Sequence, residues 1–333
     1  MAKKNKILPM QSVFIQKLRE VIPPNLALAD EMADILEISN DSAYRRIRCE
    51  TEVSIDEVYK LANKYKLSLD GIFSNLNDTV TFTYTSLIDS QDHLDRYLSR
   101  LFGHVQLVNS YPEKKNFYVA DTFPLFYSFF SKKLCEFKLF FWQRSVLNVP
   151  AYQGRKFEFG FVPEQQVNLA MDASKVYNRI PGIEVWTTET VNTNLKQLEY
   201  YVESGVFQKA SDALLILDEL KVMIESLEKW ATQGRKDENL NDDSFQFYCS
   251  DVELGSNCIY IQAGPARYAY VSFNTLNSLY TNNQVFCEEM EHWVKNIVQK
   301  STLISGIAEK QRFRFFSRIY TYISDCRERI SKH

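Results

Sequence analysis

The sequence has little of the two residues that punctuate loop-rich folds, with only 10 Gly and 9 Pro among 333 residues. Chains dense in tight turns use more of both, because Gly supplies positive φ and Pro fixes the backbone. With 45% hydrophobic and 14% aromatic residues, the chain can still bury a large core. These proportions exclude a disordered, collagen-like or rod-like protein, and they favour a helix-rich chain of two folded units.

The sequence also lacks an excess of one charge, a long apolar run and paired cysteines. Its 39 basic and 42 acidic residues give a net charge of −3, so any surface for nucleic acid must be local. The apolar stretches around 124–130 and 139–142 are far shorter than the roughly 18 residues of a membrane span. The six Cys form no Cys-x-x-Cys pair, and no signal peptide precedes them. We therefore expect reduced thiols, a cytoplasmic location and no membrane partner.

Motifs of common enzymes are absent as well. The sequence has no Walker loop, Gly-x-Gly-x-x-Gly, Gly-x-Ser-x-Gly or His-Glu-x-x-His. Its four His have no Cys or carboxylate at a metal-ligand spacing. We expect no catalytic residue, no metal and no cofactor, and hence a protein that is not an enzyme.

Aromatic residues are unevenly distributed along the chain. Residues 1–75 hold five of the 46 Phe, Trp and Tyr residues. The polar, turn-forming stretch Ser74–Asp78 then separates this part from the aromatic-rich remainder. We expect a first domain over residues 1–76 and a second over residues 80–333.

The second domain is expected to be mostly helical with a small strand portion. Apolar residues at helical spacing predict helices over 87–108, 123–146, 164–179, 192–203, 211–232, 283–299 and 307–329. Val80–Tyr84 alternates like a short strand. Three aromatic or β-branched runs predict a three-stranded antiparallel meander: Phe245–Cys249, Cys258–Gln262 and Tyr268–Phe273. The expected fold class is therefore mainly α with a small α+β portion.

The many aromatic side chains after residue 80 have two interpretations. They can fill the core and a dimer interface, or they can line a pocket for an apolar or aromatic effector. Since aromatic residues are more often buried in cores than placed in pockets, core packing is the preferred interpretation.

The most specific pattern lies in the first domain. Asn25–Leu36 reads as a short amphipathic helix that begins with Asn25 as its cap. After a break at Glu37, Ser39 caps a second helix that ends near Arg48. On that helix Ala43 and Ile47 share one side, and the opposite side is polar with Asp41, Arg45 and Arg48.

A third helix of this domain starts at Ser54, where Glu57 completes a capping box. Ser68–Phe73 adds a last helical turn. Together with the segment from Met10, the order predicts a compact bundle of five short helices.

In these features residues 10–75 resemble the lambda-repressor-like (XRE-type) helix-turn-helix family, and the Ile38–Arg48 pattern looks like a subgroup in Bacteroidetes-type bacteria. The resemblance implies that the helix over 39–48 enters the major groove of double-stranded DNA as the recognition helix of a homodimer. Glu37 and Cys49 stand where the family usually has Gly.

The resemblance also assigns roles along the recognition helix. Asn40, Asp41, Tyr44 and Arg45 take positions that face bases, and their chemistry suits adenine, cytosine and guanine for Asn40, Asp41 and Arg45 respectively. Arg46 and Arg48 are expected to contact phosphates. The expected DNA-binding set is Asn40, Asp41, Ser42, Tyr44, Arg45, Arg46 and Arg48.

The sequence thus predicts a DNA-binding transcriptional regulator with a C-terminal sensor or dimerisation domain, whose effector is a small molecule or a protein. Two alternatives remain at this point. One is a phage- or defence-type repressor whose C-terminal half binds another protein. The other is an interaction scaffold whose helix-turn-helix fold makes only protein contacts.

Overall fold

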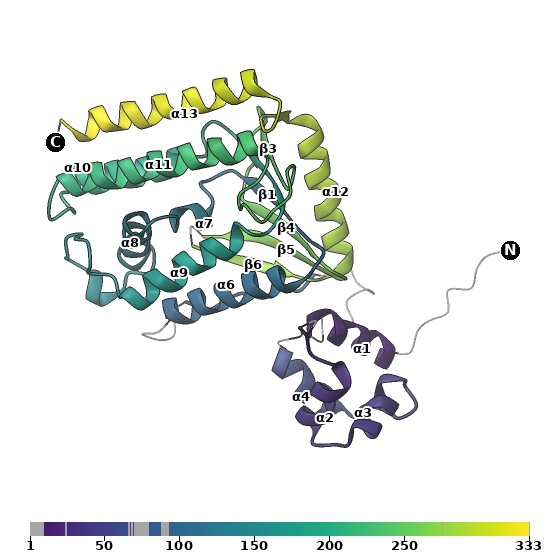
Figure 1. Cartoon of the computed structure of the whole chain (residues 1–333). Helices are drawn as coiled ribbons and strands as arrows, with labels where there is room; N and C mark the ends of the chain where they lie inside the picture. Colours follow the sequence, from purple (N-terminus) through teal and green to yellow (C-terminus); the bar gives the residue numbers. More distant parts are fainter. Residues whose placement is uncertain are drawn as a thin grey trace.

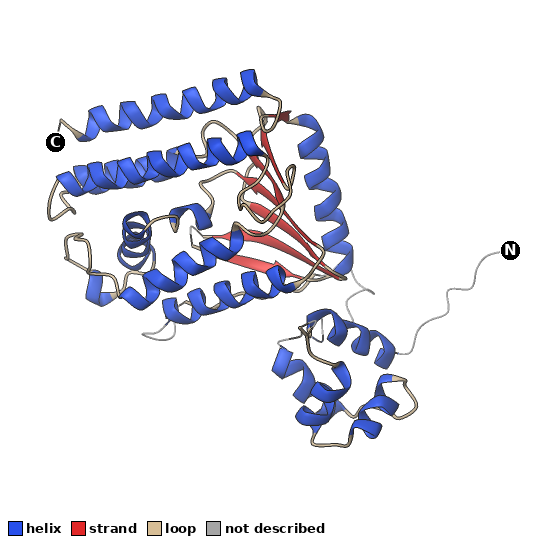
Figure 2. Cartoon of the chain, viewed as in Figure 1, coloured by secondary structure: helices blue, strands red, loops and turns tan. Residues whose placement is uncertain are grey.

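The structure, a computed structural model, describes residues 10–23, 25–65, 67, 69, 80–87, 93–274 and 276–332. Within these residues the apolar side chains pack into three clusters. One is formed only by residues between 13 and 69, and the other two only by residues between 87 and 330. The helices and strands around them are shown in Figures 1 and 2.

The first cluster is enclosed by four helices: α1 (Met10–Val21), α2 (Leu28–Leu36), α3 (Asn40–Ile47) and α4 (Ile55–Tyr65). Leu18, Met32, Ala43 and Leu61 are fully buried at its centre. The predicted last turn over 68–73 lies outside the described residues, apart from Leu69.

The predicted start of α2 at Asn25 is wrong. The helix begins at Leu28, and its N-cap is Ala27, whose side chain makes no capping bond. Asn25 instead lies in a turn that the Leu26 N–H closes by donating to the Pro23 carbonyl at 2.9 Å. Asn25 is therefore part of the turn that begins at Pro23 and is not available as a helix cap.

The prediction of a small three-stranded antiparallel meander is also wrong. Among the described residues, seven strands form one mixed sheet in the order β6-β5-β4-β1-β2-β3-β7. The β1–β2 and β2–β3 pairs are parallel, and the other pairs are antiparallel. The strands are β1 (Lys114–Ala120), β2 (Gly182–Trp186), β3 (Phe245–Cys249), β4 (Cys258–Ala263), β5 (Ala266–Phe273), β6 (Asn277–Thr281) and β7 (Thr302–Leu303).

The central strands show no alternation of apolar and polar residues, because both of their faces are buried. In β1, Phe117 and Val119 belong to one apolar cluster, while Tyr118 and Ala120 belong to another. Strands of this kind read as short apolar runs with no period of two. β2 is likewise buried at every position.

Pairing between distant segments explains the rest of the error. Phe245–Cys249 is a strand, but it pairs with β2 and β7, and β1 and β2 separate it from Cys258–Ala263 in the sheet. The antiparallel meander that does exist is β4-β5-β6. The strand expected over Val80–Tyr84 is reduced to one bridge between Thr83 and Tyr280.

Helices cover the two faces of the sheet unequally. In Figure 1, α12 (Gln284–Lys300) lies on one face, and the other long helices after residue 90 lie on the opposite side. These are α6 (His93–Ser110), α8 (Lys132–Phe141), α9 (Glu164–Tyr177), α10 (Asn192–Glu203), α11 (Ser211–Gln233) and α13 (Glu309–Ile330). No helix in the described part of the chain is long and apolar enough to cross a membrane.

A buried polar network joins β2 to the loop after α11. Glu184 is fully buried, and its Oε1 accepts from Lys236 Nζ at 3.2 Å, from the Tyr127 hydroxyl at 2.5 Å and from the Tyr177 hydroxyl at 2.9 Å. Its Oε2 accepts from Trp186 Nε1 at 3.1 Å. Because every one of these groups has a partner, the fold tolerates an ion pair at its centre.

Candidate nucleic-acid interface

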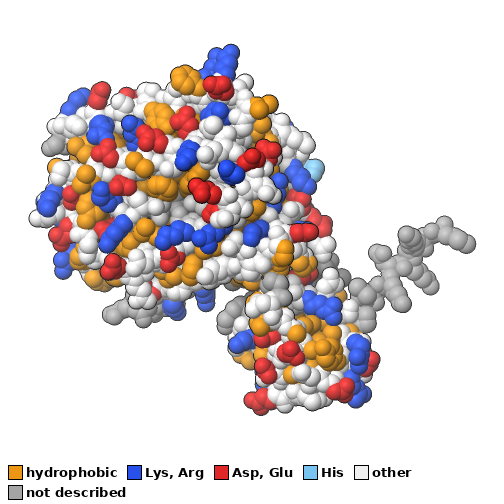
Figure 3. All heavy atoms as spheres, in the orientation of Figure 1, with side chains coloured by type: hydrophobic (Ala, Val, Ile, Leu, Met, Phe, Trp, Pro, Cys, Tyr) orange, Lys and Arg blue, Asp and Glu red, His pale blue; other side chains and the backbone are white. Residues whose placement is uncertain are grey.

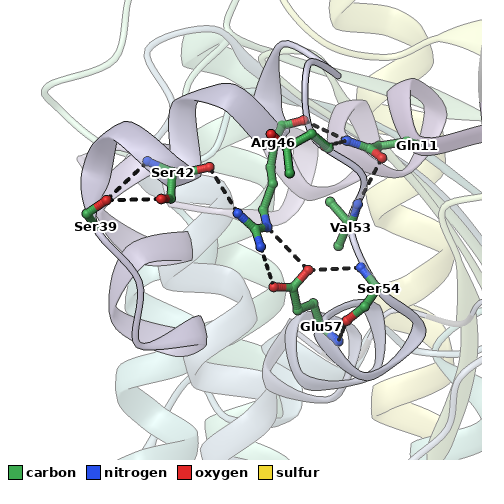
Figure 4. A network of polar contacts seen from close by, with 8 residues as sticks. Gln11, Ser39, Ser42, Arg46, Val53, Ser54 and Glu57 are labelled. Carbon is green, nitrogen blue, oxygen red and sulfur yellow. Dashed lines mark hydrogen bonds and ion pairs between the residues drawn. The ribbon is translucent and has the colours of Figure 1, made fainter.

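The start of α3 is fixed by its predicted cap. The backbone N–H of Ser42 donates to Ser39 Oγ at 3.3 Å, and the Ser39 hydroxyl donates to Ser42 Oγ at 3.1 Å (Figure 4). Ser39 has an extended backbone, as an N-cap requires. The Ser42 hydroxyl is therefore engaged within the helix start.

The predicted capping box at α4 is present and extends to α3. The Ser54 N–H donates to Glu57 Oε2 at 2.9 Å, and the Glu57 N–H donates to Ser54 Oγ at 3.2 Å. The same carboxylate accepts from Arg46 through Nη2 at 2.8 Å and Nε at 3.2 Å (Figure 4). Burial acts to raise the pKa of Glu57, but the hydrogen bonds from Arg46 and Ser54 outweigh it and hold that pKa below its ordinary value.

The segment between α3 and α4 is tied to α1 by Gln11. Its Nε2 donates to the carbonyls of Arg46 at 2.9 Å and Thr51 at 2.8 Å, and its Oε1 accepts from the Val53 N–H at 3.0 Å (Figure 4). Gln11 was not among the predicted residues. Its one visible signal is a polar residue in the first turn of an otherwise apolar helix face.

The backbone takes the left-handed conformation at both ends of this motif. Glu37, which ends α2, and Cys49, which follows α3, each have φ of 58°. These are the positions at which the resembled family usually has Gly. At both positions the left-handed backbone is thus held by residues whose side chains disfavour it.

The outer face of α3 is exposed, as its helical spacing predicts. Asp41, Tyr44 and Arg45 are exposed, whereas Ala43 is fully buried on the opposite side. The Arg45 side chain makes no hydrogen bond or ion pair with any residue that the structure describes. Its guanidinium is therefore free to bind an acceptor from outside the chain.

The remaining predicted residues are paired within the chain. The Asn40 amide donates to Asp30 Oδ1 at 3.0 Å, and exposed Arg48 forms an ion pair with Glu50 at 2.8 Å. Arg46 is only 17% exposed and is held by Glu57, so its guanidinium already has the partner that a phosphate would replace. Five of the predicted residues are therefore exposed: Asn40, Asp41, Tyr44, Arg45 and Arg48. Ser42 and Arg46 are only partly exposed and are engaged in contacts within the chain.

Figure 3 shows acidic and basic side chains interspersed over the visible face of the molecule. Within the described ranges, no group of three or more His, Cys, Asp or Glu residues is arranged to hold a metal ion.

Comparisons of the chain with protein-family models, curated proteins and solved structures found no match. What this site does must therefore be argued from its own geometry.

Proposed function

We propose that the chain is a sequence-specific DNA-binding transcriptional regulator. The observation that carries the proposal is the outer face of α3, where the unpaired guanidinium of Arg45 stands beside exposed Asp41 and Tyr44. An arginine on the outer face of a short, rigidly capped helix has the reach and the donors to bind guanine O6 and N7.

The surrounding contacts support this use of α3. Ser39, Gln11 and the Arg46–Glu57 pair fix the helix at its start and along its inner side. A recognition helix must be held rigidly, because its base contacts depend on a fixed position relative to the DNA. Arg48 would add a phosphate contact by leaving Glu50, because an exposed ion pair of this kind is weak and easily opened.

In the proposed regulator two copies of the chain act together. Their α3 helices enter successive major grooves about 34 Å apart on an inverted repeat. Residues 80–333 set that spacing as a dimerisation or sensor domain.

The test is selection from a pool of random duplex DNA at fixed salt, using the full chain. We expect an enriched inverted repeat for the wild type, and Arg45→Ala should lose about 1–3 kcal/mol of binding free energy to it. Arg314→Ala, which removes an exposed arginine of α13, is the matched control and should select the same sequence.

Each other outcome has a distinct meaning. Equal, weak binding by all three proteins would reject the proposal in favour of a protein-interaction scaffold. An enriched single site without a repeat would reject the homodimer but keep the reading role of Arg45.

A further inference from the structure

A cavity of about 380 Å³ lies in the part of the molecule that follows residue 80. Side chains from the sheet and from α6, α8 and α10 line it. This volume falls in the range of small-molecule sites, roughly 300–1,000 Å³. Much of its wall is aromatic or aliphatic, including Tyr97, Leu101, Phe123, Phe126 and Ile261.

Lys138 of α8 supplies a cation to this apolar cavity. The residue is 7% exposed, and its Nζ donates to Asn194 Oδ1 at 3.1 Å and Gln197 Oε1 at 3.0 Å. Among the described residues no carboxylate forms an ion pair with it, and Asn194 and Gln197 are the two hydrogen-bond acceptors of its ammonium. Lys236, which is also buried, differs because it forms an ion pair with Glu184 at 3.2 Å.

Two residues of the lining have a buried polar atom without a hydrogen-bond partner. Trp142 Nε1 and Asn116 Oδ1 are buried and have no hydrogen-bond partner within the described structure. Lys138 Nζ lies over the face of the Trp142 ring, 5.8 Å from its centre, and this cation–π contact supplies the ammonium with no hydrogen-bond acceptor. Buried polar atoms without a partner cost free energy, and they are rare unless a ligand or water completes them.

The charge of the lining favours an anion. Its charged side chains include Lys138 and Arg100, while Asp121 is the single carboxylate among the described lining residues. Burial lowers the pKa of His104, a further lining residue, to about 4, so this imidazole is neutral at neutral pH.

We propose that this cavity binds a small monocarboxylate with an aromatic body. The carboxylate accepts from Lys138 Nζ, and the aromatic body lies against the apolar wall. Binding itself does not depend on DNA recognition, and only the role of the ligand as an effector rests on the proposed function.

The test is isothermal titration calorimetry on the full chain without DNA. The probes are phenylacetate, 3-(4-hydroxyphenyl)propionate and indole-3-acetate, each compared with its own uncharged primary amide. We expect at least one acid to bind tenfold or more tightly than its amide. Lys138→Met should remove that preference, whereas Lys133→Met, on the same helix but paired with Glu219 outside the cavity, should keep it.

A second variant tests the cavity without changing its charge. Leu101→Trp places a larger side chain in the lining and should weaken binding of the acid and the amide alike, at an unchanged melting temperature. This variant decides the question if Lys138→Met fails to fold. The proposal is overturned if no acid binds more tightly than its amide, or if the acid binds a folded Lys138→Met or Leu101→Trp variant as it binds the wild type. Since no DNA is present, either result is independent of the selection experiment.

Discussion

Arg46 binds both carboxylate oxygens of Glu57, with Nη2 and Oε1 2.8 Å apart and Nε and Oε2 3.2 Å apart. The pair links the inner side of α3 to the first turn of α4, and both side chains are less than one-fifth exposed. Arg46 thus acts as a structural residue of the unbound protein. Its partner also closes the α4 capping box, so a single carboxylate serves both helices.

Replacing Glu57 by Ala should loosen α3 locally. The change removes the ion pair and the capping acceptor together, and we expect the free energy of local opening to fall by about 1–3 kcal/mol. Amide hydrogen exchange of α3 in the full chain measures this opening. Glu57→Gln keeps a capping oxygen and should lose less. Equal exchange in all three proteins would show that the pair does not hold α3.

The same carboxylate makes α3 sensitive to acid. The pKa of Glu57 is lower in the folded chain than its ordinary value of 4.5. Its contribution is therefore complete above about pH 4.5 and is lost as the pH falls through the lower, folded value. Hydrogen exchange of α3, corrected for intrinsic rates, should rise as the pH is lowered from 5 to 3, and Glu57→Gln should weaken this dependence.

Glycine at positions 37 and 49 should stabilise the helical unit formed by α1 to α4. Glu37 and Cys49 hold φ of 58°, which costs a residue with a side chain roughly 1–2 kcal/mol. The greater freedom of Gly in the unfolded chain offsets about 0.4–1 kcal/mol of this. Glu37→Gly and Cys49→Gly should each raise the free energy of unfolding of these helices by about 0.5–1 kcal/mol. The measurement is urea unfolding of the full chain, monitored by amide hydrogen exchange in α2 and α3. Asp34→Gly, inside α2, should instead lose about 0.3 kcal/mol.

Binding of the aromatic acids should weaken in alkaline solution. Burial lowers the pKa of Lys138 to about 8. The other charged or titratable groups of the lining include Arg100, His104, Asp121, Tyr97, Tyr118 and Tyr177. Burial raises the pKa of each of these tyrosines, and neutral His104 titrates near 4. Affinity should be constant between pH 6 and 7 and fall about tenfold per pH unit above 8, because the ammonium is lost. Calorimetric titration of the wild type with the acid from pH 6 to above pH 8 measures this affinity. An affinity that does not change with pH would contradict the role of Lys138.

A contact at the end of α6 gives a route between cavity and α1. The Tyr111 hydroxyl donates to the Glu20 carbonyl at 3.4 Å, and α6 lines the cavity through Tyr97, Leu101 and His104. If the acid is an effector, it should change operator affinity by a factor of about 5–150, and the operator should change acid affinity by the same factor. Tyr111→Phe should reduce this factor while leaving each separate affinity unchanged. An unaltered factor would place the coupling elsewhere.

The predicted helix caps at Ser39 and Ser54 are confirmed, whereas the one at Asn25 is wrong. Caps can be predicted from sequence because they depend on residues only a few positions apart. The caps at Ser39 and Ser54 and the burial of Ala43 follow from spacing within one or two helical turns. The partners of Arg46 could not be predicted in the same way. Its family-like position suggested phosphate, and only the tertiary fold brings Glu57 beside it.

The sheet and the cavity were missed because their partners are far apart in sequence. β1 pairs with β2 and β4, and no local pattern specifies either register. In the sequence, Lys138 simply precedes the apolar stretch 139–142, and its acceptors Asn194 and Gln197 lie on another helix. Aromatic residues were assigned to the core, and many are there, but part of that set also lines the cavity.

The place of β1 in the sheet has a consequence for synthesis on the ribosome. β1 ends at Ala120, yet its neighbour β4 begins only at Cys258. A nascent chain that has made β2 therefore carries one open edge of β1 until β4 has emerged, about halfway through the remaining sequence. Open strand edges recruit other chains, and pairing between distant segments is slow. The helical unit that encloses residues 13–69 meets no such delay, since all the members of its apolar cluster are translated first. We expect truncation between β3 and β4 to leave a folded helical unit attached to an aggregating or chaperone-bound remainder.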